Sequence, residues 1–467
     1  MAGIGFALRR LVQRDDLIGV AEGYGAATLI TSGPWLFTIV CLASIGALLQ
    51  DRVLPSSQAE FRAVLIYSFC FSLLFSGPAA SIATRYVADC IYKHNLRAVP
   101  SVLYVSLGLT LAGSLLVAGP FVALVLDLAR GAAVAAIMNF CLVSCIWTVS
   151  LFLSTLREHT SYAVIFAVGL LAAFAGVTIL GARYGLQGML HGFNIGLALI
   201  LFTIIGRALA AFPQALMWPK AFLGYFRSYW ELAASGIVLT AALWVDKWVM
   251  WFAPEQQIVA GGLRFHPDYD VAMYLAYLTI IPAIAVFMVS FETGLFERVF
   301  RYFSHISHHA HYAAIERNRD EIRDFTFVQL QRVLALQALI AALAIWFAPQ
   351  LLPLLGGTYS QMGIFRLGVL GASFHVLLLF LLLFLSYFDR RRLALGLHLL
   401  LLICNGLFSW ISRDLGYAYY GLGYFLASLV TFLVAYRCAL ALLERLPYYT
   451  FVARPHAHDE ASSAVSQ

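Results

Sequence analysis

The chain has 467 residues, of which 62% are hydrophobic and 12% are charged, and its formal net charge is +6. A soluble domain carries about 25% charged residues, so this composition excludes an ordinary soluble protein and indicates one embedded almost wholly in a membrane. Basic residues are retained in cytoplasmic loops of membrane proteins, so the positive charge gives little support for nucleic-acid binding.

Residues 1–24 precede the first apolar stretch and predict an amphipathic helix on the cytoplasmic membrane surface. Ile4, Leu8 and Leu11 share one face of such a helix, whereas Arg9 lies elsewhere. A cleavable signal is not expected, because it would need an apolar core of about 7–15 residues followed by a small-residue cleavage site.

Twelve long apolar stretches follow. The hydrocarbon core of a bilayer requires about 20 apolar residues per helix, and each stretch is of that order. Strands of a membrane β-barrel would instead be shorter and would alternate in polarity. The sequence therefore predicts an all-α polytopic membrane protein. The expected spans are 25–49, 61–84, 101–126, 133–156, 161–181, 186–207, 230–253, 271–295, 326–352, 362–386, 394–411 and 416–443.

The segment 211–229 divides six spans from six. We expect an N-terminal lobe at 25–210 and a C-terminal lobe at 230–445, related by an axis along the membrane normal as in some transporters. Within the second lobe, 296–325 carries opposite charges at helical spacing and predicts a charged cytoplasmic helix. It is either a docking surface or a solvated extension of the eighth span. Residues 446–467 are expected to be a cytoplasmic tail.

Lysine and arginine positions predict the orientation. About 20 of them lie on or beside one side of the twelve-span arrangement and about six on the other, and basic residues are retained in the cytoplasm. Both termini are therefore expected to be cytoplasmic. The same side receives the loops 85–100, 157–160, 208–229, 296–325 and 387–393.

Prolines interrupt three spans, at Pro34, Pro78 and Pro282. Each removes a helix hydrogen bond and favours a kink. A freed carbonyl is tolerated at membrane depth only beside a cavity or neighbouring protein. The kinks either let a bundle rearrange between inward-open and outward-open states or belong to static helices.

Asp246 and Lys247 are the deepest ionisable residues, about 24 Å along the seventh span from its cytoplasmic start. Charged groups inside a membrane are costly and are functional candidates. Adjacent helix residues point about 100° apart, so we expect each to need a partner from another helix or a wet cavity. The pair either lines a translocation path or fixes helix packing near the outer surface.

Three further candidates for a translocation path are Glu231, Glu292 and His375. Glu231 begins the seventh span, and Glu292 lies near the cytoplasmic end of the eighth. His375 is near the middle of the tenth span. Histidine titrates near neutral pH and could couple transport to protons, although a histidine that only packs between helices is more common.

Trp244, Trp248 and Trp251 share one face of the seventh span. Aromatic rings are platforms for sugar rings, and they also form the belt at a membrane interface. The position near the outer surface favours the belt.

Other motifs give little support for catalysis. Asp268 and Asp270 form a DxD pattern that in a glycosyltransferase would hold a divalent cation, but two residues carry little information. His305, His308 and His309 have a spacing that could bind a metal, yet no acidic or cysteine ligand completes the set locally. No Walker A motif and no CxxC pair occurs. We therefore expect no enzyme activity, no cofactor and no metal.

Several motifs, taken in order, resemble the PelG family over nearly the whole chain. They are the start Met1-Ala-Gly-Ile-Gly-Phe-Ala-Leu-Arg-Arg10, Ser32-Gly-Pro-Trp35, Trp244-Val-Asp-Lys-Trp248, Ile280-Ile-Pro282, Phe291-Glu-Thr293 and Tyr387-Phe-Asp-Arg390. The resemblance implies a twelve-helix transporter of the bacterial inner membrane, related to MATE-like and polysaccharide flippases of the multidrug/oligosaccharidyl-lipid/polysaccharide (MOP) superfamily.

The resemblance also implies a cargo and partners. The cargo would be the Pel exopolysaccharide, an amino-sugar polymer of biofilms, exported by a synthase complex of which the chain is the transporter subunit. The partners would be a cytoplasmic PelF-like glycosyltransferase, a PelD-like sensor of cyclic di-GMP and a PelE-like membrane protein. The alternatives are an ion-coupled flippase or antiporter of lipid-linked oligosaccharides or small molecules, a membrane glycosyltransferase, and a pure scaffold.

Overall fold

The computed structural model describes residues 37–451, except 39, 43, 47, 50–52, 94 and 156–158. The expected N-terminal amphipathic helix, Pro34 and most of the tail lie outside the described residues, as does much of the first span. Within the described part, ten helical stretches are long and apolar enough to cross a membrane. The chain is therefore a multi-pass membrane protein.

The elements are α3 (Pro55–Tyr92), α4 (Val99–Val125), α5 (Arg130–Thr155), α6 (His159–Ala211), α7 (Lys220–Ser228), α8 (Trp230–Met250), β1 (Gln257–Val259), β2 (Leu263–Phe265), α9 (Pro267–Leu278), α10 (Ile281–Ser290), the π-helix η1 (Phe291–Leu295), α11 (Phe296–Ser307), α12 (Tyr312–Trp346), α13 (Ala348–Leu354), η2 (Tyr359–Gln361), α14 (Met362–Tyr387), α15 (Arg391–Leu415), η3 (Tyr417–Tyr419), α16 (Leu422–Glu444) and α17 (Leu446–Phe451). The two strands form an antiparallel hairpin in which Ile258 pairs with Arg264.

The 53 residues of α6 are two spans joined at one residue. A straight helix of this length would measure about 80 Å, far more than the hydrocarbon core of about 30 Å. Gly185 has φ 57° and ψ −138°, a conformation essentially restricted to glycine, and it reverses the chain. A Cβ atom on Gly176 would lie 2.7 Å from the carbonyl oxygen of Gly192, so the two arms touch backbone to backbone. The two expected spans 161–181 and 186–207 are both present.

Small residues make this close approach possible. Gly188, Gly192 and Gly196 recur every fourth residue on the second arm, and a Cβ atom on Gly196 would meet the carbonyl oxygen of Gly169 at 2.3 Å. Such small-xxx-small faces let membrane helices pack where no hydrophobic force drives them together.

Prolines shape two of the other predicted spans. Pro282 stands in the first turn of α10, after α9 has ended at Leu278, so the eighth span is broken near this proline. Pro78 lies inside the continuous helix α3. Beside it, a Cβ atom on Gly77 would lie 3.4 Å from the backbone of Gly236, so α3 and α8 also pack closely.

The described residues form two compact units. One contains the residues up to Val271 together with His398–Tyr417, and the other contains Ala272–Leu397 and the residues from Ala418 onward. This division differs from the boundary at 211–229 expected from span counting. The reason is that α8 packs against α3, and the Tyr67 hydroxyl of α3 donates to the carbonyl oxygen of Arg264 at 3.0 Å.

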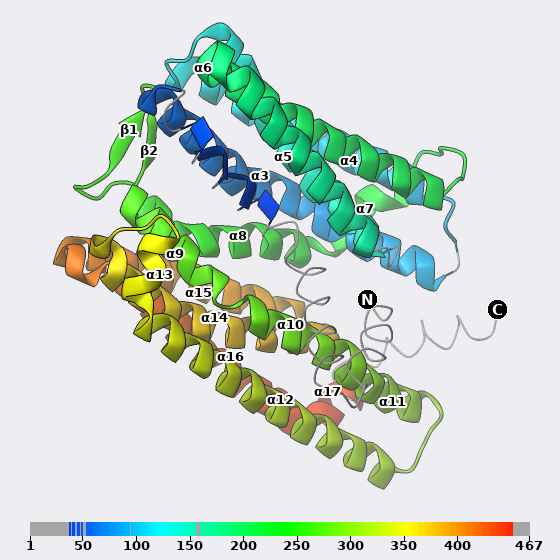
Figure 1. Ribbon diagram of the computed structural model, residues 1–467. Coiled ribbons are helices and arrows are strands. Elements are labelled where there is room, and N and C mark those ends of the chain that lie inside the picture. Colours follow the sequence, from blue (N-terminus) through cyan, green and yellow to red (C-terminus); the bar gives the residue numbers. More distant parts are fainter. Residues whose placement is uncertain are drawn as a thin grey trace, which may run out of the picture. The chain divides into compact units, whose positions relative to one another are not determined.

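Each unit has its own helix packing. In the first, α5 contacts α3, α4 and α6, and these helices run side by side (Figure 1). In the second, α14 packs against α12 and α16. The backbone of Gly371 lies against the Tyr424 ring there, where an added Cβ atom would be 2.4 Å from the ring.

The charged segment 296–325 is divided between two helices instead of forming one. It comprises α11, which follows directly from the eighth span, and the first turns of α12, which continue into the ninth. The chain reverses at His308–His311, where His309 has φ 52°. Across this hairpin Arg301 and Glu321 lie 3.3 Å apart, and Glu316–Arg319 and Asp320–Arg323 pair along α12 at 3.4 and 3.6 Å.

Candidate functional site

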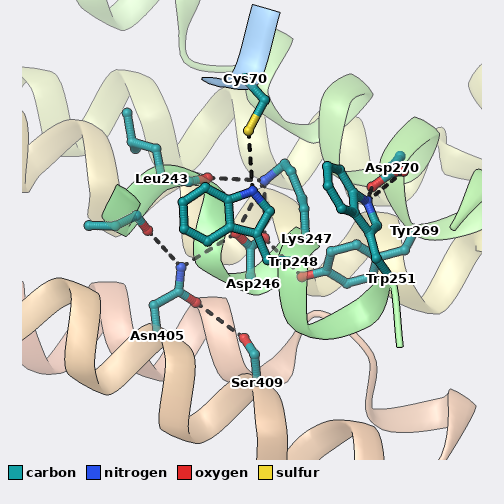
Figure 2. A network of polar contacts seen from close by, with 11 residues as sticks. Cys70, Leu243, Asp246, Lys247, Trp248, Trp251, Tyr269, Asp270, Asn405 and Ser409 are labelled. Carbon is teal, nitrogen blue, oxygen red and sulfur yellow. Dashed lines mark hydrogen bonds and ion pairs between the residues drawn. The ribbon is translucent and has the colours of Figure 1, made fainter. Parts of the chain in front are cut away.

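Asp246 and Lys247 lie in the last turns of α8 and form an ion pair inside the first unit. Nζ of Lys247 is 3.1 Å from Oδ2 and 3.3 Å from Oδ1 of Asp246 (Figure 2). Asp246 has no exposed surface and Lys247 is 7% exposed. Their Cα–Cβ directions differ, but the long lysine stem lets the ammonium fold back, where it also donates to the carbonyl oxygen of Leu243 at 3.2 Å.

Other helices supply the further partners of the carboxylate. The Tyr269 hydroxyl from the start of α9 donates to Oδ2 of Asp246 at 3.0 Å. Nδ2 of Asn405 from α15 lies 3.5 Å from Oδ1, and donates to the carbonyl oxygen of Ala242 at 2.9 Å. Ser409, one turn further along α15, donates to Oδ1 of Asn405 at 3.2 Å. The network therefore ties α8 to α9 and α15.

Whether a buried ion pair stabilises the fold depends on how many hydrogen bonds the two charged groups receive. Burying two charges costs several kcal/mol per ion, and only close geometry with added hydrogen bonds offsets that cost. Here the carboxylate receives the ammonium, a hydroxyl and an amide. Removal of one member would leave an uncompensated charge, at a cost of about 3–5 kcal/mol, whereas neutralising both need not destabilise.

Two of the three tryptophans attach α8 to α3. The Trp248 ring lies parallel to Phe71 with centroids 5.5 Å apart, and its Nε1 donates to Sγ of Cys70 at 3.2 Å. Trp251 stacks on Tyr67 at 4.7 Å and is 3% exposed. Both rings pack α8 against α3. The expectation of an interfacial belt is wrong for Trp251, because its ring is buried inside the unit, whereas Trp248 is half-buried.

The DxD carboxylates do not converge on one point. Asp270 accepts from Nε1 of Trp251 at 3.2 Å and from the backbone N–H of His266 at 3.2 Å. Asp268 instead accepts from the Tyr417 hydroxyl at 3.2 Å. Each carboxylate therefore has a partner that holds the chain in place. Within the described ranges, no group of three histidine, cysteine or acidic side chains has metal-binding geometry.

His266 begins α9 as its capping residue. Nδ1 accepts from the backbone N–H of Tyr269 at 3.2 Å, while Asp270 accepts from the His266 N–H, a reciprocal arrangement like a capping box. Nε2 lies 3.7 Å from Oε2 of Glu255. Burial lowers the pKa of His266 below its usual 6.5, and the nearby Glu255 carboxylate opposes this only in part.

The remaining candidates are placed separately. Glu231 is buried at the start of α8, about 22 Å along the helix from Asp246. His375 is buried in the second unit, with the ring centroids of Tyr277 and Tyr424 6.2 and 6.0 Å away. Glu292 belongs to the π-helix η1, and its side chain lies outside the described residues.

Several polar partners were missed by sequence reasoning. Asn405 and Tyr269 complete the Asp246 network, and Ser235 lies 2.6 Å from Nδ1 of His398 between α8 and α15. The available signal was the presence of Asn405 and His398 within an apolar span, where polar side chains need partners.

The family model PelG, described as "Putative exopolysaccharide Exporter (EPS-E)", matches residues 1–451. No curated protein sequence matches the chain.

Solved structures with a similar fold are MOP-superfamily transporters. The outward-facing conformation of a multidrug resistance MATE family transporter has a TM-score of 0.62 and 14% identity, covering 95% of this chain and 97% of that chain. A MATE transporter in complex with MaD5 has a TM-score of 0.61 and 13% identity, covering 90% and 96%. A MOP superfamily transporter from Pyrococcus furiosus has a TM-score of 0.59 and 14% identity, covering 94% and 97%. The expected all-α, MATE-like fold is confirmed.

Proposed function

This chain belongs to the PelG family, and from that premise we propose that it carries an exopolysaccharide across the bacterial inner membrane. The observation that carries the proposal is the match of an exporter family over residues 1–451 together with a fold shared by MOP transporters. We expect the cargo to be a Pel-type amino-sugar polymer.

The proposal includes a synthase complex. A cytoplasmic PelF-like glycosyltransferase would extend the polymer, while PelD-like and PelE-like membrane proteins would assemble with this chain, the former sensing cyclic di-GMP. The distribution of lysine and arginine supports an orientation with both termini and the charged α11–α12 hairpin in the cytoplasm. The chain itself acts as a transporter and not as an enzyme, and Asp268 and Asp270 serve as structural hydrogen-bond acceptors.

The closed contacts of Asp246 and Lys247 favour a packing role over direct contact with the cargo. The carboxylate is fully buried, and its partners Tyr269 and Asn405 are protein groups from neighbouring helices. The pair would hold α8 in the position that the bundle needs for export. In the competing role the pair lines the translocation path, and export would then depend on the two charges.

An export assay separates the two roles. Cells lacking the native gene would receive the wild-type chain, Asp246→Ala, or the double variant Asp246→Asn/Lys247→Met, and secreted and intracellular polymer would be measured beside the amount of inserted protein. A packing role predicts that the single variant inserts poorly and the double variant exports normally. A lining role predicts that the double variant inserts normally but fails to export.

The adjacent pair Arg413 and Asp414 provides the matched control, because its groups lie 2.8 Å apart and Asp414 is exposed. Changing both to glutamine and asparagine is expected to leave export unchanged. If cells without the chain secrete the same amount of polymer as cells that contain it, the proposed function itself is wrong.

The second candidate function is an ion-coupled flippase or antiporter. The observation that favours it is the buried His375 beside the rings of Tyr277 and Tyr424, because histidine is the side chain that can couple transport to protons. This candidate predicts that the purified chain alone transports a lipid-linked oligosaccharide into vesicles, with a rate that depends on pH or sodium.

A further inference from the structure

An open pocket of about 480 Å³, lined by charged and apolar side chains, lies between α11 and α12 in the second unit. It occupies the part of α12 where the charged first turns give way to the apolar span. Its lining residues are Arg298, Glu321, Asp324, Phe325, Val328, Gln329 and Arg332.

Arg298 is held in place on one wall of the pocket. Its Nη1 donates to the carbonyl oxygen of Gly294, in the π-helix, at 2.9 Å, and its guanidinium lies 4.2 Å from the centre of the Phe325 ring. Gly294 itself packs against that ring, since an added Cβ atom would be 2.2 Å away from it. Gly294 of the π-helix thus accepts the hydrogen bond from Arg298, and its lack of a side chain leaves room for the Phe325 ring on which the guanidinium lies.

The pocket lining carries two arginines and two carboxylates, so its formal charge is zero. Its two carboxylates already have arginine partners outside the lining, since Glu321 pairs with Arg301 at 3.3 Å and Asp324 with Arg323 at 3.1 Å. Arg298 and Arg332 have no carboxylate partner among the residues that the structure describes. Two cationic groups are therefore available to an anion.

Gln329 provides a second, independent observation. Its side chain lines the pocket and is only 6% exposed, yet its Oε1 has no hydrogen-bond partner within the described part of the chain. A buried polar atom without a partner costs about 1–3 kcal/mol. A ligand with hydroxyl groups beside its negative charge would satisfy this oxygen.

An exposed apolar side chain also lines the pocket. Val328 is 43% exposed on α12. An arginine pair next to an exposed apolar side chain, where a span begins, matches the interface of a membrane and not an aqueous surface. The ligand should then combine a negatively charged head with hydrocarbon.

We propose that this pocket binds the headgroup of an anionic phospholipid of the phosphatidylglycerol class. Arg298 and Arg332 would hold the phosphodiester, which the fork of a guanidinium binds in bidentate fashion. Gln329 would accept a hydrogen bond from a headgroup hydroxyl, and the acyl chains would lie on Val328. Basic pockets between membrane helices bind anionic headgroups in this way.

The test uses the full chain purified in detergent, with native mass spectrometry to count bound lipid during titration with phosphatidylglycerol or phosphatidylcholine. Phosphatidylglycerol is expected to bind saturably and phosphatidylcholine weakly. Arg332→Gln is expected to weaken phosphatidylglycerol binding about fivefold, and the double variant Arg298→Gln/Arg332→Gln more than that. Arg332 is exposed and makes no hydrogen bond or ion pair with the described residues, so its single variant should fold normally.

Arg317→Gln is the matched control, because Arg317 is exposed on α12 outside the pocket and carries the same charge. Equal loss of binding in Arg317→Gln and Arg332→Gln would mean only general attraction to basic helices and would overturn the proposal. Competition by inorganic phosphate at the concentration at which phosphatidylglycerol binds would also overturn it, since the site would then recognise a free anion. None of these readouts depends on polymer export.

Discussion

The Tyr269 hydroxyl donates a hydrogen bond to Oδ2 of Asp246 at 3.0 Å, and both side chains are fully buried. This bond links the first turn of α9 to the end of α8, although 23 residues and a β-hairpin separate the two in the chain. It is the shortest contact between the Asp246 carboxylate and another helix among those described.

Tyr269→Phe should therefore destabilise the protein with almost no change in shape. A hydrogen bond to a charged group contributes about 1.5–3 kcal/mol, and the loss should lower the midpoint of thermal unfolding in detergent. Tyr359→Phe serves as the control, because Tyr359 is exposed. An unchanged midpoint for Tyr269→Phe would show that the Asp246 network does not need this donor.

Neutralising Lys247 alone should be worse than neutralising both members of the pair. Lys247→Met leaves the buried Asp246 carboxylate without its cation, at an expected cost of about 3–5 kcal/mol. Adding Asp246→Asn should recover most of that stability, because no uncompensated charge remains. Unfolding of the two variants and the wild type in one detergent gives the comparison, and a double variant no more stable than the single would contradict the closed ion pair.

Gly192→Ala should prevent the two arms of α6 from packing. The new Cβ atom would lie 2.3 Å from the backbone of Gly176, which cannot move aside as a flexible side chain can. We expect a strong loss of folded protein, measured by size-exclusion chromatography after solubilisation. Gly206→Ala, on the same helix but with nothing within 4 Å of an added Cβ atom, should be neutral or slightly stabilising.

Acidification should weaken the start of α9 through His266. Burial holds the pKa of His266 below 6.5 in the folded state, so the unfolded chain binds the proton more readily. The stability that depends on neutral His266 is therefore fully present above pH 6.5 and is lost as the pH falls from there toward the folded-state pKa. Protonation would also convert Nδ1 from an acceptor into a donor and break its bond with the Tyr269 N–H.

His266→Asn provides the comparison for this pH dependence. Asparagine is a good N-cap residue and does not titrate in this range, so it keeps an acceptor at the helix start. The midpoint of thermal unfolding should fall less between pH 7.5 and 5.5 for the variant than for the wild type. Identical slopes would show that His266 does not contribute.

The helices could be predicted because length and apolarity alone determine which segments cross a bilayer. The short connection at 181–186 was consistent with two spans, and the structure shows why it suffices: Gly185 adopts a conformation that other residues avoid. The break in the eighth span also followed from a local cause, the missing N–H of Pro282.

The composition of the Asp246 site could be predicted only in part. Asp246 and Lys247 could be identified because they lie deep within the seventh predicted span. Asn405 could not, because it is 159 residues from Asp246 in the chain and only the fold brings the two together. The direct pairing was not expected, because backbone geometry fixes Cβ directions but not where a long lysine stem ends. The use of Trp251 was also missed, since helical spacing does not tell whether a face meets lipid or another helix.

The backbone contact between Gly176 and Gly192 has a consequence for biogenesis. Because each arm of α6 covers part of the other and a single residue connects them, the two spans should enter the bilayer together as a preformed hairpin. A nascent chain stalled after the first arm would leave its glycine face uncovered. Insertion of this region should therefore depend on synthesis reaching Gly196, after which both arms can leave the translocon as one body.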